Sequence, residues 1–252
     1  MYIFASIWSH CHVSEWKHSL IITVIMNETA KSVTESTRKD VFERDGKQCW
    51  LCNRDILGLH VAHHIDASEF HSFSRFQENG TIPSVVTDPS HCDNLFPLCP
   101  HCHVAYSATF PEWVLIPDEE TLQTYINHEK NDYEQRHSMV SSDSSDSVPP
   151  RSLPPIDRTK ILYHPLIITH QFKSLLANRF NSLQWPKHWP GEPTTVIHRA
   201  ARRGLFESTP VQPFRFPGKR LGCGRGWQTG VPENFQILVG ELIRLWARHP
   251  PR

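Results

Sequence analysis

Residues 93–103 read DNLFPLCPHCH, and this stretch decides how the chain is interpreted. It holds one Cys-x-x-Cys pair, Cys99 and Cys102, and a second pair, Cys49 and Cys52, lies upstream. Four thiolates in two such pairs can surround one zinc ion tetrahedrally. The alternative is disulfides, which a secreted chain would allow. Because Leu20–Met26 makes a poor signal peptide, we expect an intracellular protein, nuclear or cytoplasmic, with a structural zinc ion on these cysteines.

The neighbouring segments predict short helices and strands around the two cysteine pairs. A helix over 98–108 would place Cys99, Cys102 and His103 at positions i, i+3 and i+4, and therefore on one face. Residues 57–65 are rich enough in apolar and β-branched residues for a strand, in a β-hairpin. The other predicted elements are a helix from Thr37 to Asp45, a strand over 113–116, a helix capped by Asp118, and helices over 171–180 and 234–247. Residues 66–93 form a long polar connection.

Four motifs follow one another in a specific order: CWLC at 49–52, HHI at 63–65, DNLFPLC at 93–99 and CPHCH at 99–103. This order resembles the HNH endonuclease family, with its ββα-metal fold and, in many members, a flanking four-cysteine zinc site. The resemblance covers roughly residues 37–136. It implies that His64 is the general base, that Asn94 is the middle residue of the catalytic trio, and that His103 is a ligand of the catalytic metal. His63 falls where many members have an acidic ligand, so it is assigned to the metal too.

These residue types suit the hydrolysis of a phosphodiester, whose anionic oxygens repel a nucleophile. A histidine with a pKa near 6.5 can remove the proton of an attacking water near neutral pH. A divalent cation on His63 and His103 would stabilise the charge that develops on the phosphoryl group. Asn94 would hold strand and loop so that the base keeps its orientation. Two imidazoles leave the cation open between Mg²⁺, Mn²⁺, Ni²⁺ and Zn²⁺. Taken singly, a histidine in a chain with 17 of them is more often structural.

Length and composition predict an α+β chain with a division near residue 140. A length of 252 residues allows one or two domains, and 20 prolines indicate long irregular stretches. Residues 138–156, rich in Ser, Asp and Pro, predict a disordered linker. We therefore expect a disordered N-terminal extension at 1–36, an HNH module at 37–137, the linker, and a basic, proline-rich region of low order at 157–252. No apolar run approaches the roughly 20 residues of a membrane span.

The two halves of the chain carry opposite charge. Residues 1–150 hold 10 Lys and Arg against 21 Asp and Glu, whereas residues 151–252 hold 16 against 5. A basic C-terminal half is a hint of a nucleic-acid partner, here DNA, with 199–203 and 218–227 as phosphate-contacting segments. Ion pairing between the halves is the alternative. For the function, the alternatives to an endonuclease are a zinc-stabilised nucleic-acid-binding module and a protein-interaction module, both without catalysis. Oligomeric state stays open.

Overall fold

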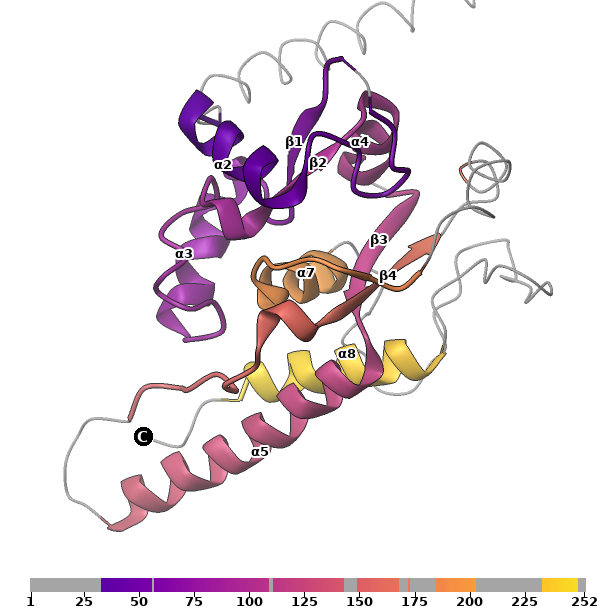
Figure 1. The fold of residues 1–252 in the computed structure, drawn as a ribbon. Coiled ribbons are helices and arrows are strands. Elements are labelled where there is room, and N and C mark those ends of the chain that lie inside the picture. The colour runs from indigo at the N-terminus through magenta and orange to yellow at the C-terminus, as the bar shows by residue number, and fades with distance from the viewer. Residues whose placement is uncertain are drawn as a thin grey trace, which may run out of the picture. The chain divides into compact units, whose positions relative to one another are not determined.

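The computed structural model describes residues 33–55, 57–108, 111–142, 149–167, 172, 185–202 and 233–248. It mixes helices and strands, as expected (Figure 1). The helices are α2 (Glu35–Asp45), α3 (Phe70–Glu78), α4 (Pro100–Ser107), α5 (Glu119–Ser142), α7 (Pro193–Ala200) and α8 (Glu233–Trp246), and the short 3₁₀ turns are η1 (Ala67–Glu69), η2 (Cys92–Asn94) and η3 (Arg158–Lys160). The strands are β1 (His60–His63), β2 (Leu95–Leu98), β3 (Trp113–Pro117), β4 (Leu162–Ile167) and β5 (Lys187–His188).

Strands β1 and β2 form an antiparallel pair, and α4 follows β2 directly. The register sets His60 opposite Leu98 and His63 opposite Leu95. Helix α4 begins where the sulfur of Cys99 caps it and Pro100 supplies a preset helical φ, as proline does at a first helical position. The predicted strand over 57–65 is confirmed in its central part. Its partner is not the adjacent segment of a tight hairpin but β2, thirty residues later, and the long connection between them contains helix α3.

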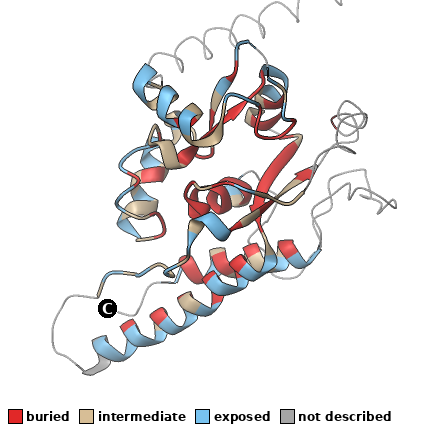
Figure 2. Cartoon of the chain, viewed as in Figure 1, coloured by how far each residue is buried: buried red, intermediate tan, exposed pale blue. Residues whose placement is uncertain are grey.

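A second antiparallel sheet, in the order β3-β4-β5, forms the centre of the core. All five residues of β3 are buried, because the sheet is covered on both faces. One covering element is α7, all eight residues of which are buried, as Figure 2 shows by their red colour. A helix without an exposed face must be enclosed by the rest of the chain. Segment 193–200 is therefore an internal part of this fold.

Helices α5 and α8 lie side by side and close the other end of the core (Figure 1). The side chain of Asp118 accepts a hydrogen bond of 2.7 Å from the Thr121 amide, which confirms the predicted cap of α5. The apolar face of α8 packs against α5 and β3, and an ion pair of 2.6 Å joins Lys130 to Glu241 at the rim. The prediction of a helix over 234–247 is confirmed to within one residue at each end.

The expected division into a nuclease module, a linker at 138–156 and a low-order region at 157–252 differs from the structure. Helix α5 continues to Ser142, and Arg151, inside the expected linker, donates hydrogen bonds to the Glu129 carboxylate (3.0 Å) and the Asn79 carbonyl (2.6 Å). Residues 33–252 form one compact unit. The composition of 138–156 did not indicate that this segment is anchored to the fold. The anchor is a single residue, Arg151, whose charge-assisted hydrogen bonds hold an otherwise polar segment.

Some expectations fall outside the described residues. These are most of the extension at 1–36, the helix expected over 171–180 and the basic segment 218–227. Among the residues that are described, no helix combines the length and apolar character that a membrane span requires.

Candidate functional site

The four predicted zinc ligands come together at one end of α4. Cys49 and Cys52 lie in the turn after α2, whereas Cys99 caps α4 and Cys102 lies in its first turn. All four thiols are free and buried, and their sulfur atoms lie within 4.8 Å of one another. The sulfurs of Cys52 and Cys99 are 3.8 Å apart. Ligands at about 2.3 Å from a tetrahedral zinc ion would lie about 3.8 Å apart, so the cluster has the dimensions of a metal site.

Local backbone geometry explains how the first pair is presented. Asn53 has a φ of 54°, the left-handed conformation that asparagine tolerates better than most residues. Its amide donates to the Cys49 carbonyl (2.8 Å), while the Cys49 amide donates to the Arg54 carbonyl (2.8 Å), so the chain turns tightly around the thiols. Hydrogen bonds from Cys102 and Cys49 lower the pKa of Cys52 to about 7. The pKa of Cys99 is lowered as well, whereas the contacts with the other thiols raise the pKa of Cys102 and Cys49.

His103 lies one residue beyond the cysteine pair on α4, and its nearest imidazole neighbour is His60. The Nδ1 atoms of the two rings are 3.2 Å apart, and the rings meet edge to face with centroids 5.1 Å apart. His60 is exposed at the start of β1, and the β1–β2 register brings that end of the strand to the beginning of α4. His60 was not predicted to have a role. Its position four residues before His64 could have indicated one, because side chains at even spacings along a strand share a face, and both rings contact α4.

His63 was expected to share a metal ion with His103. It is half-buried at the end of β1, and its Nε2 atom is buried without a hydrogen-bond partner among the described residues. Desolvation lowers its pKa, and the carboxylate of Asp66 acts in the opposite direction. Burial lowers the pKa of His103, and the neighbouring His60 and, to a smaller degree, His63 act in the same direction. The described residues contain two groups of three or more mutually close donors, and neither includes His63.

His64, expected to be the general base, is completely buried. Its ring stacks on Phe96 with centroids 4.4 Å apart and meets the edge of Trp189 at 4.5 Å. Nδ1 lies 2.6 Å from the Tyr106 hydroxyl, while Nε2 has no hydrogen-bond partner in the described chain. Burial holds the pKa of His64 well below its ordinary 6.5, and the nearby Arg199 lowers it further. The imidazole is therefore neutral at pH 7.

Asn94 is fully buried and ties the end of β1 to the loop before β2. Its amide nitrogen donates to the carbonyls of Ile65 (2.9 Å) and Pro89 (2.7 Å), and its amide oxygen accepts from the Ile65 amide (3.0 Å). The Asn94 backbone carbonyl also accepts from the His64 amide (2.9 Å). These bonds fix the backbone that carries His64, and they engage both amide hydrogens of Asn94 inside the protein.

Two residues near His64 come from the region expected to have low order. Trp189, buried, closes the aromatic enclosure of His64. Arg199, on α7 and 2% exposed, donates to the His64 carbonyl (3.3 Å), the Asp66 carboxylate (3.1 Å) and the Tyr106 carbonyl. No local pattern marks either residue, since Arg199 lies 93 to 135 positions from its hydrogen-bond partners and Trp189 lies far from His64 in the sequence.

The opposite charges of the two halves meet inside the molecule. Arg199 pairs with Asp66 at 3.1 Å, Arg202 with Glu69 at 3.3 Å, Arg158 with Asp93 at 2.8 Å, and Arg151 with Glu129 at 3.0 Å. The expectation that 199–203 follows phosphates does not fit Arg199, because its guanidinium is buried and paired. For the described residues, the alternative of ion pairing between the halves accounts for these contacts.

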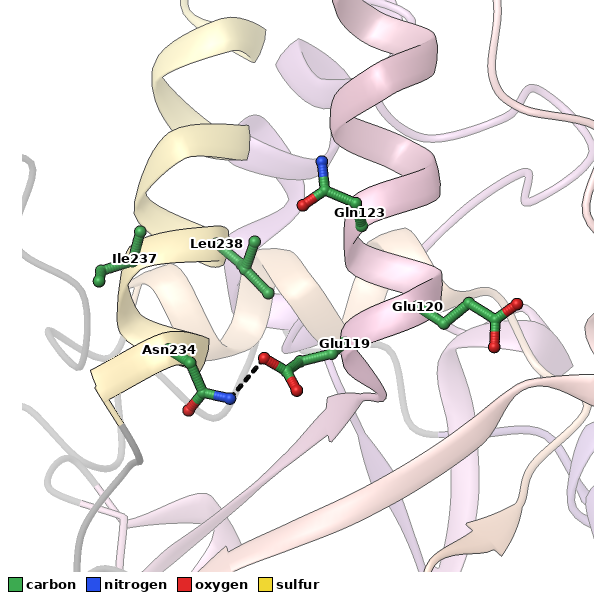
Figure 3. A pocket seen from close by; sticks show the side chains of 6 residues that line it. All are labelled: Glu119, Glu120, Gln123, Asn234, Ile237 and Leu238. Carbon is green, nitrogen blue, oxygen red and sulfur yellow. Dashed lines mark hydrogen bonds between the residues drawn. The ribbon is translucent and has the colours of Figure 1, made fainter.

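Two other features are weaker candidates for a site. His91, Cys92 and Asp93 place three donors close together, but Arg44 and Arg158 already pair with the Asp93 carboxylate. A shallow pocket lies between α5 and α8, where Asn234 donates a hydrogen bond to Glu119 (Figure 3). None of the predicted site residues lines it.

A comparison of the chain with models of protein families, with curated proteins and with solved structures found no match.

Proposed function

We propose that this protein is a metal-dependent endonuclease of the HNH type that hydrolyses DNA phosphodiester bonds. The observation that carries the proposal is the β1-β2-α4 unit, in which Asn94 braces the strand end that bears His64 while His103 projects from the helix beside a second imidazole. The motif order that suggested the family supports the proposal further, because the motif residues lie on or next to β1, β2 and α4.

The four cysteines would hold a zinc ion that joins the turn after α2 to the start of α4. With four sulfur ligands no position remains for water, so this ion would be structural. A divalent cation at His103 would supply positive charge next to the scissile phosphate. Its identity stays among Mg²⁺, Mn²⁺, Ni²⁺ and Zn²⁺.

His64 would act as the base through Nε2. In the tautomer in which Nδ1–H donates to the Tyr106 hydroxyl oxygen, Nε2 carries a free lone pair, and the lowered pKa keeps it unprotonated at neutral pH. Because Nε2 is buried, water and substrate can reach it only after side chains around the ring move. The proposal therefore includes a displacement of such a side chain when DNA binds, and Trp189, whose ring centroid lies 4.5 Å from that of His64, is a candidate.

The same enclosure favours a second candidate, a zinc-stabilised module that binds nucleic acid or protein without catalysis. An imidazole stacked on Phe96 and Trp189 also serves as an ordinary core residue, with Tyr106 satisfying one nitrogen. In this candidate His64 contributes stability alone.

A plasmid-nicking assay separates the candidates. Full-length protein is incubated with supercoiled DNA and Mg²⁺, Mn²⁺ or Ni²⁺, with and without chelator, and cation-dependent nicking is expected. In His64→Asn, the shorter amide can keep the contact with Tyr106 but lacks Nε2, so we expect a folded protein and a loss of cleavage of about 100-fold or more. His71→Asn, which makes the same change at an exposed histidine of α3, is the matched control and should retain most of the activity. Salt-dependent DNA binding without nicking would favour the non-catalytic module, and full activity in a folded His64→Asn protein would exclude His64 as the base.

A further inference from the structure

The pair of imidazoles formed by His60 and His103 has an unusual geometry for two unconnected histidines. Their Nδ1 atoms face each other at 3.2 Å across the gap between β1 and α4. A direct hydrogen bond would account for the distance if one nitrogen carries a proton. The dimensions also match a shared ion, because two nitrogens bound at about 2.0–2.1 Å to a tetrahedral cation lie about 3.3–3.4 Å apart.

The surroundings favour an ion that remains open to solvent. His60 is exposed and His103 half-buried, so one side of the pair faces water. The described residues place no third His, Cys, Asp or Glu donor in a close group with this pair. Two protein ligands leave at least two positions of a tetrahedral ion for water or a phosphate oxygen, which is the arrangement a catalytic metal needs and a structural one lacks.

We infer that His60 and His103 bind one divalent transition-metal ion through their Nδ1 atoms, and that His60, rather than His63, is the second imidazole ligand. Imidazole nitrogen selects ions such as Co²⁺, Ni²⁺ or Zn²⁺ over the oxygen-seeking Mg²⁺. This inference deepens the proposed function, because the ion would be the one beside the scissile phosphate. Metal binding, however, can be measured without DNA.

The test is calorimetric titration of Co²⁺ into the full-length chain after its cysteine cluster has been loaded with zinc. We expect one Co²⁺ per chain to bind, and we expect His60→Ala and His103→Ala each to weaken binding by more than the roughly 10–100-fold typical of changes around a metal site. The loss in the double variant should be smaller than the sum of the two single losses, in free energy, since both residues serve the same ion. His101→Ala, which removes an exposed histidine from the same helix, is the matched control and should bind as the unmodified chain does.

The alternatives give different results. No Co²⁺ binding beyond the zinc site, or unchanged affinity in His60→Ala with loss in His63→Ala, would overturn the inference. Co²⁺ binding that depends on His60 without any DNA nicking would support the inference and remove the nuclease proposal. Conversely, nicking at the full rate by His60→Ala would leave the nuclease standing and reject His60 as a ligand.

Discussion

The start of α4 carries two kinds of candidate metal ligand, cysteine and histidine, in contrasting surroundings. Cys99 and Cys102 face inward, meet a second pair of thiols and are buried. His103, the next residue, reaches the rim of the same unit and meets a single exposed imidazole. Four enclosed donors would make a site whose ion is part of the fold, whereas two donors at a surface would make a site whose ion can exchange and react. Burial and donor number thus assign the two regions different roles.

The largest expected effect comes from removing one sulfur of the cluster. A structural zinc ion contributes roughly 10–16 kcal/mol of binding free energy, comparable to the whole stability of a domain. We expect Cys102→Ser to lose zinc and to be unfolded at 25 °C, as measured by metal content and circular dichroism. Cys92→Ser, which changes a free cysteine outside the cluster, is the matched control. A folded, zinc-free Cys102→Ser protein would show that the cluster is not structural.

Asn94→Ala should have the next largest effect. The change removes three hydrogen bonds and leaves the Ile65 amide and two carbonyls unpaired in the interior. At roughly 1 kcal/mol or somewhat more for each buried group, we expect a loss of about 3–4 kcal/mol in urea unfolding. Zinc content should be unchanged, because the cysteines are not touched. An unchanged unfolding midpoint in Asn94→Ala would mean that these hydrogen bonds do not stabilise the backbone that carries His64.

Protons compete with metal ions for the ligands of both sites, so the two sites can be compared by lowering the pH only while the protein stays folded. Buried His198 limits the pH range in which it does. Burial lowers the pKa of His198 to about 3 from an ordinary 6.5. The folded state therefore binds fewer protons than the unfolded state between these values, and stability present above pH 6.5 is lost as pH falls toward 3. The expected loss is roughly 3 kcal/mol at pH 4.5. His198→Phe, which can keep the stacking on Phe76 and Trp246, should flatten this pH dependence in chemical unfolding; an unchanged slope would contradict the assignment.

The smallest expected effect on stability comes from gentle metal removal. A weak chelator should strip the open histidine site first and leave the enclosed cysteine site loaded. We expect nicking to stop while the unfolding free energy changes by less than about 1 kcal/mol, and we expect added Mn²⁺ or Ni²⁺ to restore nicking. Simultaneous loss of activity and fold would indicate that the two regions do not differ as proposed.

Sequence patterns predicted the parts of this fold that depend on neighbours along the chain. Asp118 at the start of α5 and the apolar face of α8 were recognisable locally, as was the convergence of two Cys-x-x-Cys pairs. Helix α3 was missed although Phe70, Phe73 and Phe76 recur at every third position, because the polar residues and the prolines around them in 66–93 resembled a loop.

The surroundings of the candidate site were not predicted, and the roles of its residues stay predictions. Asn94 accepts a backbone hydrogen bond from His64 and His103 lies on α4, yet the enclosure of His64 by Trp189 and the pairing of Arg199 with Asp66 depend on contacts between distant segments. Composition made 157–252 look weakly ordered because its helices and strands are short and separated by prolines. Their burial could not be predicted from the sequence, because it depends on the assembly of β4 and β5 into one sheet with β3 from the N-terminal half.

The position of α7 also affects when the candidate site can form during synthesis. Trp189 and Arg199 lie against residues that leave the ribosome more than a hundred positions earlier. Since chains emerge and fold from the amino terminus, the histidine-bearing unit must wait, incompletely covered, until residue 200 has been translated. A nascent chain stalled before that point would expose Phe96 and Tyr106 and present a target for chaperones.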